Sequence, residues 1–145
     1  MFSDFLSRLT QPQPAPFTDD DARLALTALL VRVARSDNDY ADSEMARIDR
    51  ISVERYDLSP FEAAGLRARA EDLEAEAPDT VRFTRAIKEA VAYDDRLAVV
   101  QALWSVALAD GHRTGEEDSL LRLVVSLLGI SDVDSAMARQ KAAKS

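Results

Sequence analysis

The stretch "VALADGHRTGEED" (residues 106–118) decides how this chain is expected to fold. An apolar segment ends in a short loop that holds Asp110, and glutamates then open a second segment. The same order occurs in "VARSDNDYADSEM" (residues 33–45), where an aspartate again follows a Val-Ala pair and a glutamate again stands seven residues later. Acids matched across a loop are more specific than apolar periodicity, which all amphipathic helices share. We therefore interpret the two stretches as copies of one helix–acidic loop–helix unit.

A shift of the chain on itself by 73 residues extends this match beyond the loops. The shift pairs Asp37 with Asp110 and Glu44 with Glu117. Apolar positions agree as well: Leu30 with Leu103, Val33 with Val106, Ile48 with Leu121, and Ile51 with Val124. A repeated unit of this size buries its apolar face by packing on its neighbour, so we expect the two copies to share one core.

Helix-start and helix-stop residues divide the chain further. "SPFE" (residues 59–62) predicts a helix start with Ser59 as N-cap and Pro60 at the first helical position. Asp79 is placed to start another helix, and Gly129 to end one. No stretch has the alternation of a strand. The sequence predicts an all-α bundle of about seven to eight helices, with Phe61, Phe83 and Trp104 on apolar stripes and therefore in the core.

The same signals predict the domain organisation. Residues 1–16 form an amphipathic segment followed by the Pro-rich linker "QPQPAP". Residues 17–140 form a single helical domain, because 145 residues are enough for one core and too few for two. We expect residues 141–145 to be a frayed tail.

Composition and charge exclude several classes of function. The chain has no cysteine, which excludes disulfides and thiolate chemistry. Its 26 acidic residues against 18 basic ones give a net charge of −8, and such a chain repels nucleic acid. No secretory signal is recognised, and no apolar run reaches the roughly 18 residues that a membrane-spanning helix needs. We predict a cytoplasmic protein without a transmembrane segment.

The acidic loops suggest a hard-cation site, because Ca²⁺ and Mg²⁺ prefer several converging oxygen ligands. The candidate ligands are Asp37, Asp39, Glu44, Asp110 and Glu117. Neither loop is an EF-hand, since the last ligand position falls on Ile48 in the first loop and Leu121 in the second. Capping is the alternative. Thr114 and Glu117 have the spacing of a capping box, whereas Ala41, at the matching place in the first loop, cannot cap with its side chain.

The sequence offers little for catalysis. His112 is the only histidine, and no nucleophile elbow, His-Glu-x-x-His pair or phosphate-binding glycine loop accompanies it. We therefore predict that the protein is not an enzyme. A metal-assisted hydrolase using the loop acids and His112 stays the weaker alternative.

"LLVRVARSDNDYADSEMARID" (residues 29–49) and "LWSVALADGHRTGEEDSLLRLVVSLLGIS" (residues 103–131) resemble the TerB-like family, in its uncharacterised bacterial branch. The shared signature is an apolar-Ala-x-x-Asp-Gly run followed by a glutamate that opens the next helix. In the first copy, Ser36-Asp37-Asn38 replaces Ala-Asp-Gly. The resemblance covers roughly residues 22–138.

The resemblance implies a function as well as a fold. It implies a pair of helical repeats in which Asp37, Glu44, Asp110 and Glu117 hold a divalent cation such as Ca²⁺. It also implies a scaffold role in tellurite and general chemical stress, with protein partners and without catalysis. A metal-free protein–protein adaptor is the main alternative. The formation of a homo-oligomer is left open, because the N-terminal segment and the repeat both offer apolar faces.

Overall fold

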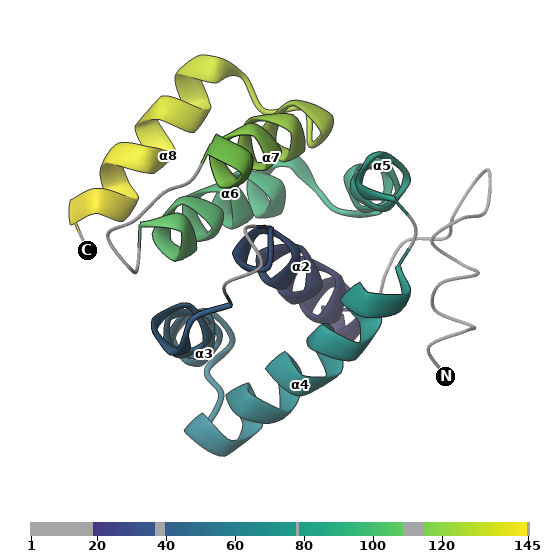
Figure 1. Cartoon of the computed structure of the whole chain (residues 1–145), viewed down its shortest axis with the longest axis vertical. Coiled ribbons are helices and arrows are strands. Elements are labelled where there is room, and N and C mark those ends of the chain that lie inside the picture. Colours follow the sequence, from purple (N-terminus) through teal and green to yellow (C-terminus); the bar gives the residue numbers. More distant parts are fainter. Residues whose placement is uncertain (1–18, 37–39, 78, 109–114, 145) are drawn as a thin grey trace.

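The computed structural model describes residues 19–36, 40–77, 79–108 and 115–144, which form seven helices and no strand (Figure 1). The predicted all-α bundle is confirmed. In chain order the helices are α2 (Asp19–Ala34), α3 (Asp42–Tyr56), α4 (Pro60–Glu76), α5 (Thr80–Ala90), α6 (Tyr93–Ala107), α7 (Gly115–Leu127) and α8 (Asp132–Lys144).

The helices repeat with the spacing that the sequence predicts. Ala34 and Ala107, which end α2 and α6, are 73 residues apart. The same spacing separates Asp42 and Gly115, which begin α3 and α7. The most extensive packing in each copy is also equivalent, with α2 on α4 in the first and α6 on α8 in the second. The fold is therefore two copies of a three-helix unit, and α5 joins them.

The two copies are interlocked. Helix α2 packs on α6, while α3 of the first copy packs on α6 of the second and α7 of the second packs on α2 of the first. These reciprocal contacts give the copies a pseudo-two-fold relation. Figure 1 shows α8 at the top of the view and α4 at the bottom, with α2 and α6 between them. One continuous core results.

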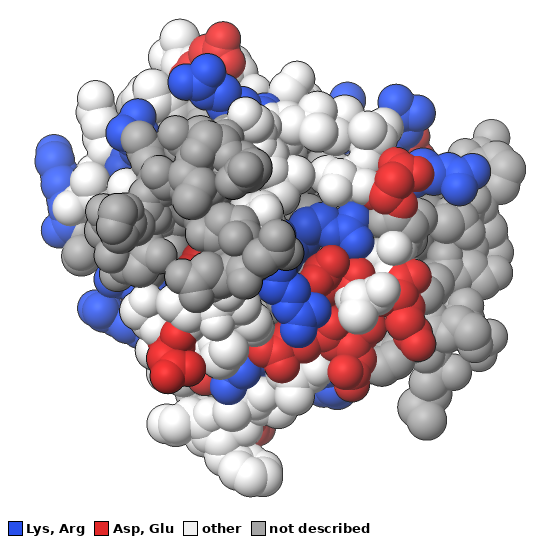
Figure 2. Space-filling model, in the orientation of Figure 1, with Lys and Arg blue, Asp and Glu red and all other residues white. Residues whose placement is uncertain are grey.

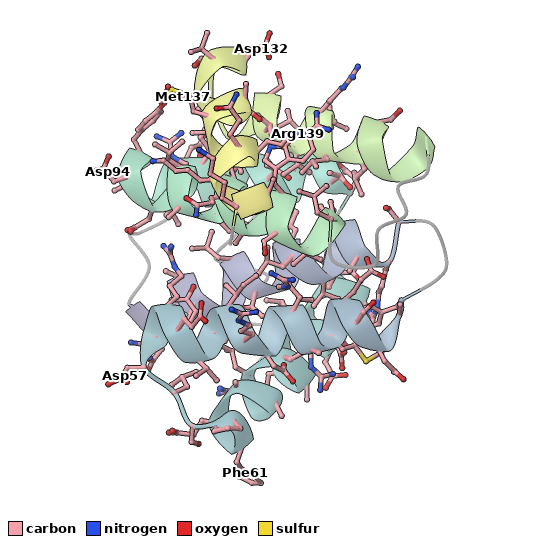
Figure 3. The ribbon with its side chains drawn as sticks, turned by 90° about the vertical axis from the view of Figure 1, so that its left-hand side faces the viewer. Asp57, Phe61, Asp94, Asp132, Met137 and Arg139 are labelled. Atoms are coloured by element: carbon pink, nitrogen blue, oxygen red, sulfur yellow. The ribbon has the colours of Figure 1, made fainter. Side chains whose placement is uncertain are left out.

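Two of the three predicted core aromatics are buried. Phe83 is 0% exposed and Trp104 is 9% exposed, and both belong to the main apolar cluster. The prediction for Phe61 is wrong, because its side chain is 89% exposed and points away from the helices in Figure 3. Phe61 is the second residue of α4, two positions after the capping residue Ser59. A position in the first helical turn can extend beyond the core even when its spacing matches the apolar stripe.

The predicted caps form as expected. The backbone N–H of Glu62 donates to Ser59 Oγ at 3.1 Å, and the N–H of Ser59 donates to Glu62 Oε1 at 2.9 Å. These hydrogen bonds lower the pKa of Glu62. The N–H of Arg82 donates to Asp79 Oδ1 at 3.0 Å, which caps α5. Gly129 has φ +76° and follows α7 in a C-terminal turn that only glycine adopts without strain.

The end of the chain differs from the prediction. Helix α8 continues to Lys144, through most of the range expected to fray. Ala138 and Ala142 lie one turn apart on its buried side, at 4% and 6% exposure. Small side chains let α8 pack closely on α6, so the helix is held by tertiary contacts that local sequence does not reveal. Ser145 lies outside the described residues.

Within the described helices, none is both long enough and apolar enough to cross a bilayer.

Thr84 in α5 is a local weakness of the core. Its side chain is 0% exposed, and in the described part of the chain its Oγ1 has no hydrogen-bond partner. We expect Thr84→Val to raise the free energy of unfolding by about 1 kcal/mol, because it removes an unsatisfied buried hydroxyl. Denaturant unfolding measures the change. The control is Thr27→Val, since buried Thr27 donates to the Arg23 carbonyl at 2.7 Å. A Thr84 variant no more stable than the Thr27 variant would contradict the prediction.

Candidate acidic-loop site

The structure describes only part of the predicted cation site. Asp37, Asp39 and Asp110 lie outside the described residues. Glu117 is the third residue of α7, and the position of its side chain is not described. Glu44 is the third residue of α3 and is described in full. The two glutamates that the repeat pairs therefore stand at the same position in equivalent helices.

Glu44 is almost completely buried, at 1% exposure. Its Oε1 accepts a hydrogen bond of 3.0 Å from the backbone N–H of Ala41, the N-cap residue of α3. This bond is the glutamate half of a capping box, which forms although an alanine side chain cannot supply the other half. Ala41 makes no cap with its side chain, as the sequence predicts, yet Glu44 still takes part in capping α3. Only the backbone of the N-cap residue is needed to donate to Glu44.

The described residues alone do not make a cation site. No group of three or more His, Asp or Glu side chains that could hold a metal ion is found among them. Glu44 supplies one carboxylate, while Ca²⁺ takes six to eight oxygen ligands and Mg²⁺ six. A carboxylate is a suitable ligand for either ion, but one carboxylate is too few to hold it. The assignment of Asp37, Asp39, Glu44, Asp110 and Glu117 as ligands stays a prediction.

An ion-pair network joins α3 to α4. Arg67 donates to Asp49 Oδ1 at 2.7 Å and to Glu71 Oε2 at 3.0 Å, and the Tyr40 hydroxyl donates to Glu71 Oε2 at 2.8 Å. Burial and the bond to Glu71 raise the pKa of Tyr40, while the bond to Asp49 raises the pKa of Arg67. The network holds Tyr40, which lies just before α3, against α4.

A second group of ion pairs joins α2 to the end of α4. Glu74 accepts from Arg32 Nε at 3.2 Å and from Arg35 Nη1 at 2.9 Å. Arg32 also lies over the Phe83 ring, with its guanidinium carbon 5.2 Å from the ring centroid. Acidic and basic side chains also lie in direct contact on the face drawn in Figure 2. Together, the two groups of ion pairs attach both α2 and α3, the helices that the first loop joins, to α4.

The sequence analysis did not predict these contacts. The only sequence signal for them is the spacing of Arg67 and Glu71, which places their side chains on one face of α4. The other pairs join residues about 18 to 42 positions apart, and those depend on the packing of α2, α3 and α4.

Comparisons with known proteins agree with the fold and the repeat. The family model of tellurite resistance protein TerB matches residues 23–140, which include most of the described helices. No curated protein and no solved structure gives a significant match. Because the family model covers well over half of the sequence, this chain belongs to the TerB family.

Proposed function

We propose that this chain is a non-catalytic scaffold module of a tellurite or chemical-stress system, whose paired acidic loops bind a divalent cation. The TerB family model supports the association with such a system. The bound cation would fix the angle between the helices that each loop joins. Protein partners would then dock on a surface whose shape depends on the ion.

The observation that carries the cation proposal is the position of Glu44. Its carboxylate is buried at the start of α3, at the place that the repeat gives to Glu117 in α7. A buried carboxylate is stabilised by hydrogen bonds and by nearby positive charge. A Ca²⁺ or Mg²⁺ ion held by Asp37, Asp39 and Glu44 in the first loop, and by Asp110 and Glu117 in the second, would add positive charge at these carboxylates.

The second candidate is a metal-free adaptor, and the hydrogen bond from Ala41 favours it. That bond already gives Glu44 Oε1 a role in capping α3. On this alternative the loops are stabilised by caps alone, and chelators leave the stability unchanged.

The non-catalytic part of the proposal rests on the sequence, which combines a single histidine with no cysteine. A metal-assisted hydrolase would use the loop acids and His112 around an ion with an open coordination position. Turnover of a hydrolysable ester or phosphate by the metal-loaded protein would support that alternative instead.

A thermal melt of metal-stripped protein, followed through Trp104 emission, tests the cation proposal. We expect millimolar Ca²⁺ or Mg²⁺ to raise the midpoint. At 100 times the dissociation constant a ligand stabilises by about 2.7 kcal/mol, which is about 5 to 10 °C for a chain of this size.

Two variants make the melt specific. Asp110→Asn and Glu44→Gln remove one charge each, and the Gln side chain keeps an oxygen that can accept from the Ala41 N–H. We expect both to reduce the rise in midpoint, whereas Glu76→Gln, at an exposed position of α4, should not. An unchanged midpoint for the unmodified protein would rule out the cation site and favour the metal-free adaptor.

A further inference from the structure

A groove of about 300 Å³ lies between α3 and α6 on the face shown in Figure 3. Asp57, just after α3, and Asp94, near the start of α6, are at the same end of that view, so the two helices run antiparallel. Helix α8 contributes Ala142 to the wall. The polar side chains that line the groove are Arg47, Arg50, Glu54, Arg55, Gln101 and Ser105, so arginines outnumber acids three to one.

Arg47 differs from most half-buried arginines of the described chain. Arg32, Arg35 and Arg67 each pair with at least one carboxylate. Arg47 donates to Ser105 Oγ at 3.2 Å, and no described carboxylate lies within ion-pair distance of it. A guanidinium has five N–H donors in a planar fork that fits a carboxylate or phosphate. Arg47 therefore presents donors to an anion in the groove.

The other two arginines of the groove have weak partners. Arg50 pairs with Glu54 at 3.1 Å, and Arg55 pairs with Asp95 at 3.7 Å. Both carboxylates are well exposed, at 66% and 63% of their side chains. Exposed ion pairs contribute little stability and exchange readily with another anion. The groove thus concentrates positive charge on a chain whose net charge is −8.

The pseudo-two-fold relation shows what kind of ligand has the right shape. It exchanges α3 with α7 and α6 with α2, so the equivalent of this groove lies between α7 and α2. Helix α5 packs against both α7 and α2, and among the described helices none takes the same place against α3 and α6. Phe83 and Ile87 of α5 are 0% exposed. One groove is therefore filled by an amphipathic helix of 11 residues, and the described chain supplies no such helix for the other.

The residues of the two grooves differ in a way that fits two kinds of helix. The 73-residue shift pairs Arg47 with Leu120, Arg50 with Leu123, Glu54 with Leu127 and Arg55 with Leu128. Ile51, at the centre of the open groove, pairs with Val124 and keeps its apolar character. A helix suited to the open groove would keep a narrow apolar stripe over Ile51 and carry carboxylates beside it.

We propose that the groove between α3 and α6 binds an acidic amphipathic helix of a partner protein, about three turns long. The apolar stripe of that helix packs on Ile51 and the neighbouring alanines. Its carboxylates pair with Arg47, Arg50 and Arg55. The proposal rests on the proposed scaffold function, because it names the partner of the module, but it does not depend on a bound cation.

The probe for this proposal is a peptide made from the helix that fills the equivalent groove. A fluorescein-labelled peptide of residues 79–91 carries Arg82→Glu, Arg85→Glu and Lys88→Glu, which keep its apolar side and make its exposed positions acidic. The reference peptide has the unchanged sequence of the same segment. Fluorescence anisotropy measures the binding of both to the full chain in EDTA, so a failure of the cation site does not affect the result.

We expect the acidic peptide to bind at least about tenfold more tightly than the reference peptide. In the protein, Arg47→Glu with Arg50→Glu should weaken binding of the acidic peptide by at least about tenfold. Arg47→Gln with Arg50→Gln, a milder change, should weaken it less. The matched control is Arg82→Glu with Arg85→Glu in the protein, which has the same charge change and spacing on exposed positions of α5. Circular dichroism checks that each variant is folded.

Three outcomes would overturn the proposal. The first is no binding of the acidic peptide, or binding no tighter than that of the reference peptide. The second is equal loss of binding in the groove variant and the α5 control, which would indicate attraction to net charge alone. The third is displacement by millimolar inorganic phosphate together with a phosphate-induced rise in melting midpoint that needs Arg47, which would make the groove a small-anion site.

Discussion

Replacing Phe83 with alanine is expected to lower the free energy of unfolding by about 3 to 5 kcal/mol. Phe83 is 0% exposed and lies in α5, the helix that joins the two copies. Its removal would leave a cavity where α5 meets α2 and α7, and would also remove the ring under Arg32. Phe83→Ala therefore removes both a large buried side chain and a contact with the Arg32 guanidinium.

Phe61→Ala is the matched control for Phe83→Ala. It removes the same atoms from a side chain that is 89% exposed, so the stability should change by less than about 0.5 kcal/mol. Urea unfolding of the two variants and the parent protein measures both values. Similar losses at the two positions would contradict the placement of α5 in the core.

Glu74→Ala is expected to cost about 2 to 3 kcal/mol, because it leaves two partly buried guanidiniums without their shared carboxylate. The Glu74 and Arg32 side chains are each 13% exposed, and that of Arg35 is 36% exposed. This partial exposure places the expected loss below that of a fully buried pair. Arg32 would keep its bond to the Glu74 backbone carbonyl, so α2 would still contact α4.

A double-mutant cycle separates this loss from a general effect of charge. Glu74→Ala and Arg35→Ala remove the two partners, singly and together, and their coupling in urea unfolding gives the contribution of the pair. Glu76→Ala, at an exposed position of the same helix, is the control and should be near neutral. An additive cycle would show that Arg35 and Glu74 do not stabilise one another.

The sequence predicted the features that depend on neighbours along the chain. Ser59 with Glu62, Asp79 and Gly129 form their caps because each needs partners only a few residues away. The repeat was also predictable, since a constant shift is visible without knowing how the copies pack. The exposed Phe61 shows the limit. Helical spacing gives the face of a side chain but not whether another helix covers that turn.

The candidate site was less predictable for the same reason. That Glu44 would stand early in a helix follows from the repeat, but its burial depends on the packing around α3. The network from Tyr40 through Glu71 to Arg67 connects segments that only the tertiary fold brings together. The groove beside Arg47 depends on the packing of α3 against α6, which local sequence does not reveal.

Because α3 packs on α6 and α7 packs on α2, neither copy is expected to be stable alone. Either three-helix copy by itself would expose the apolar face that the other covers, and a small domain has little stability to spare. The two copies therefore stabilise each other, and removing either one would uncover part of the core of the other.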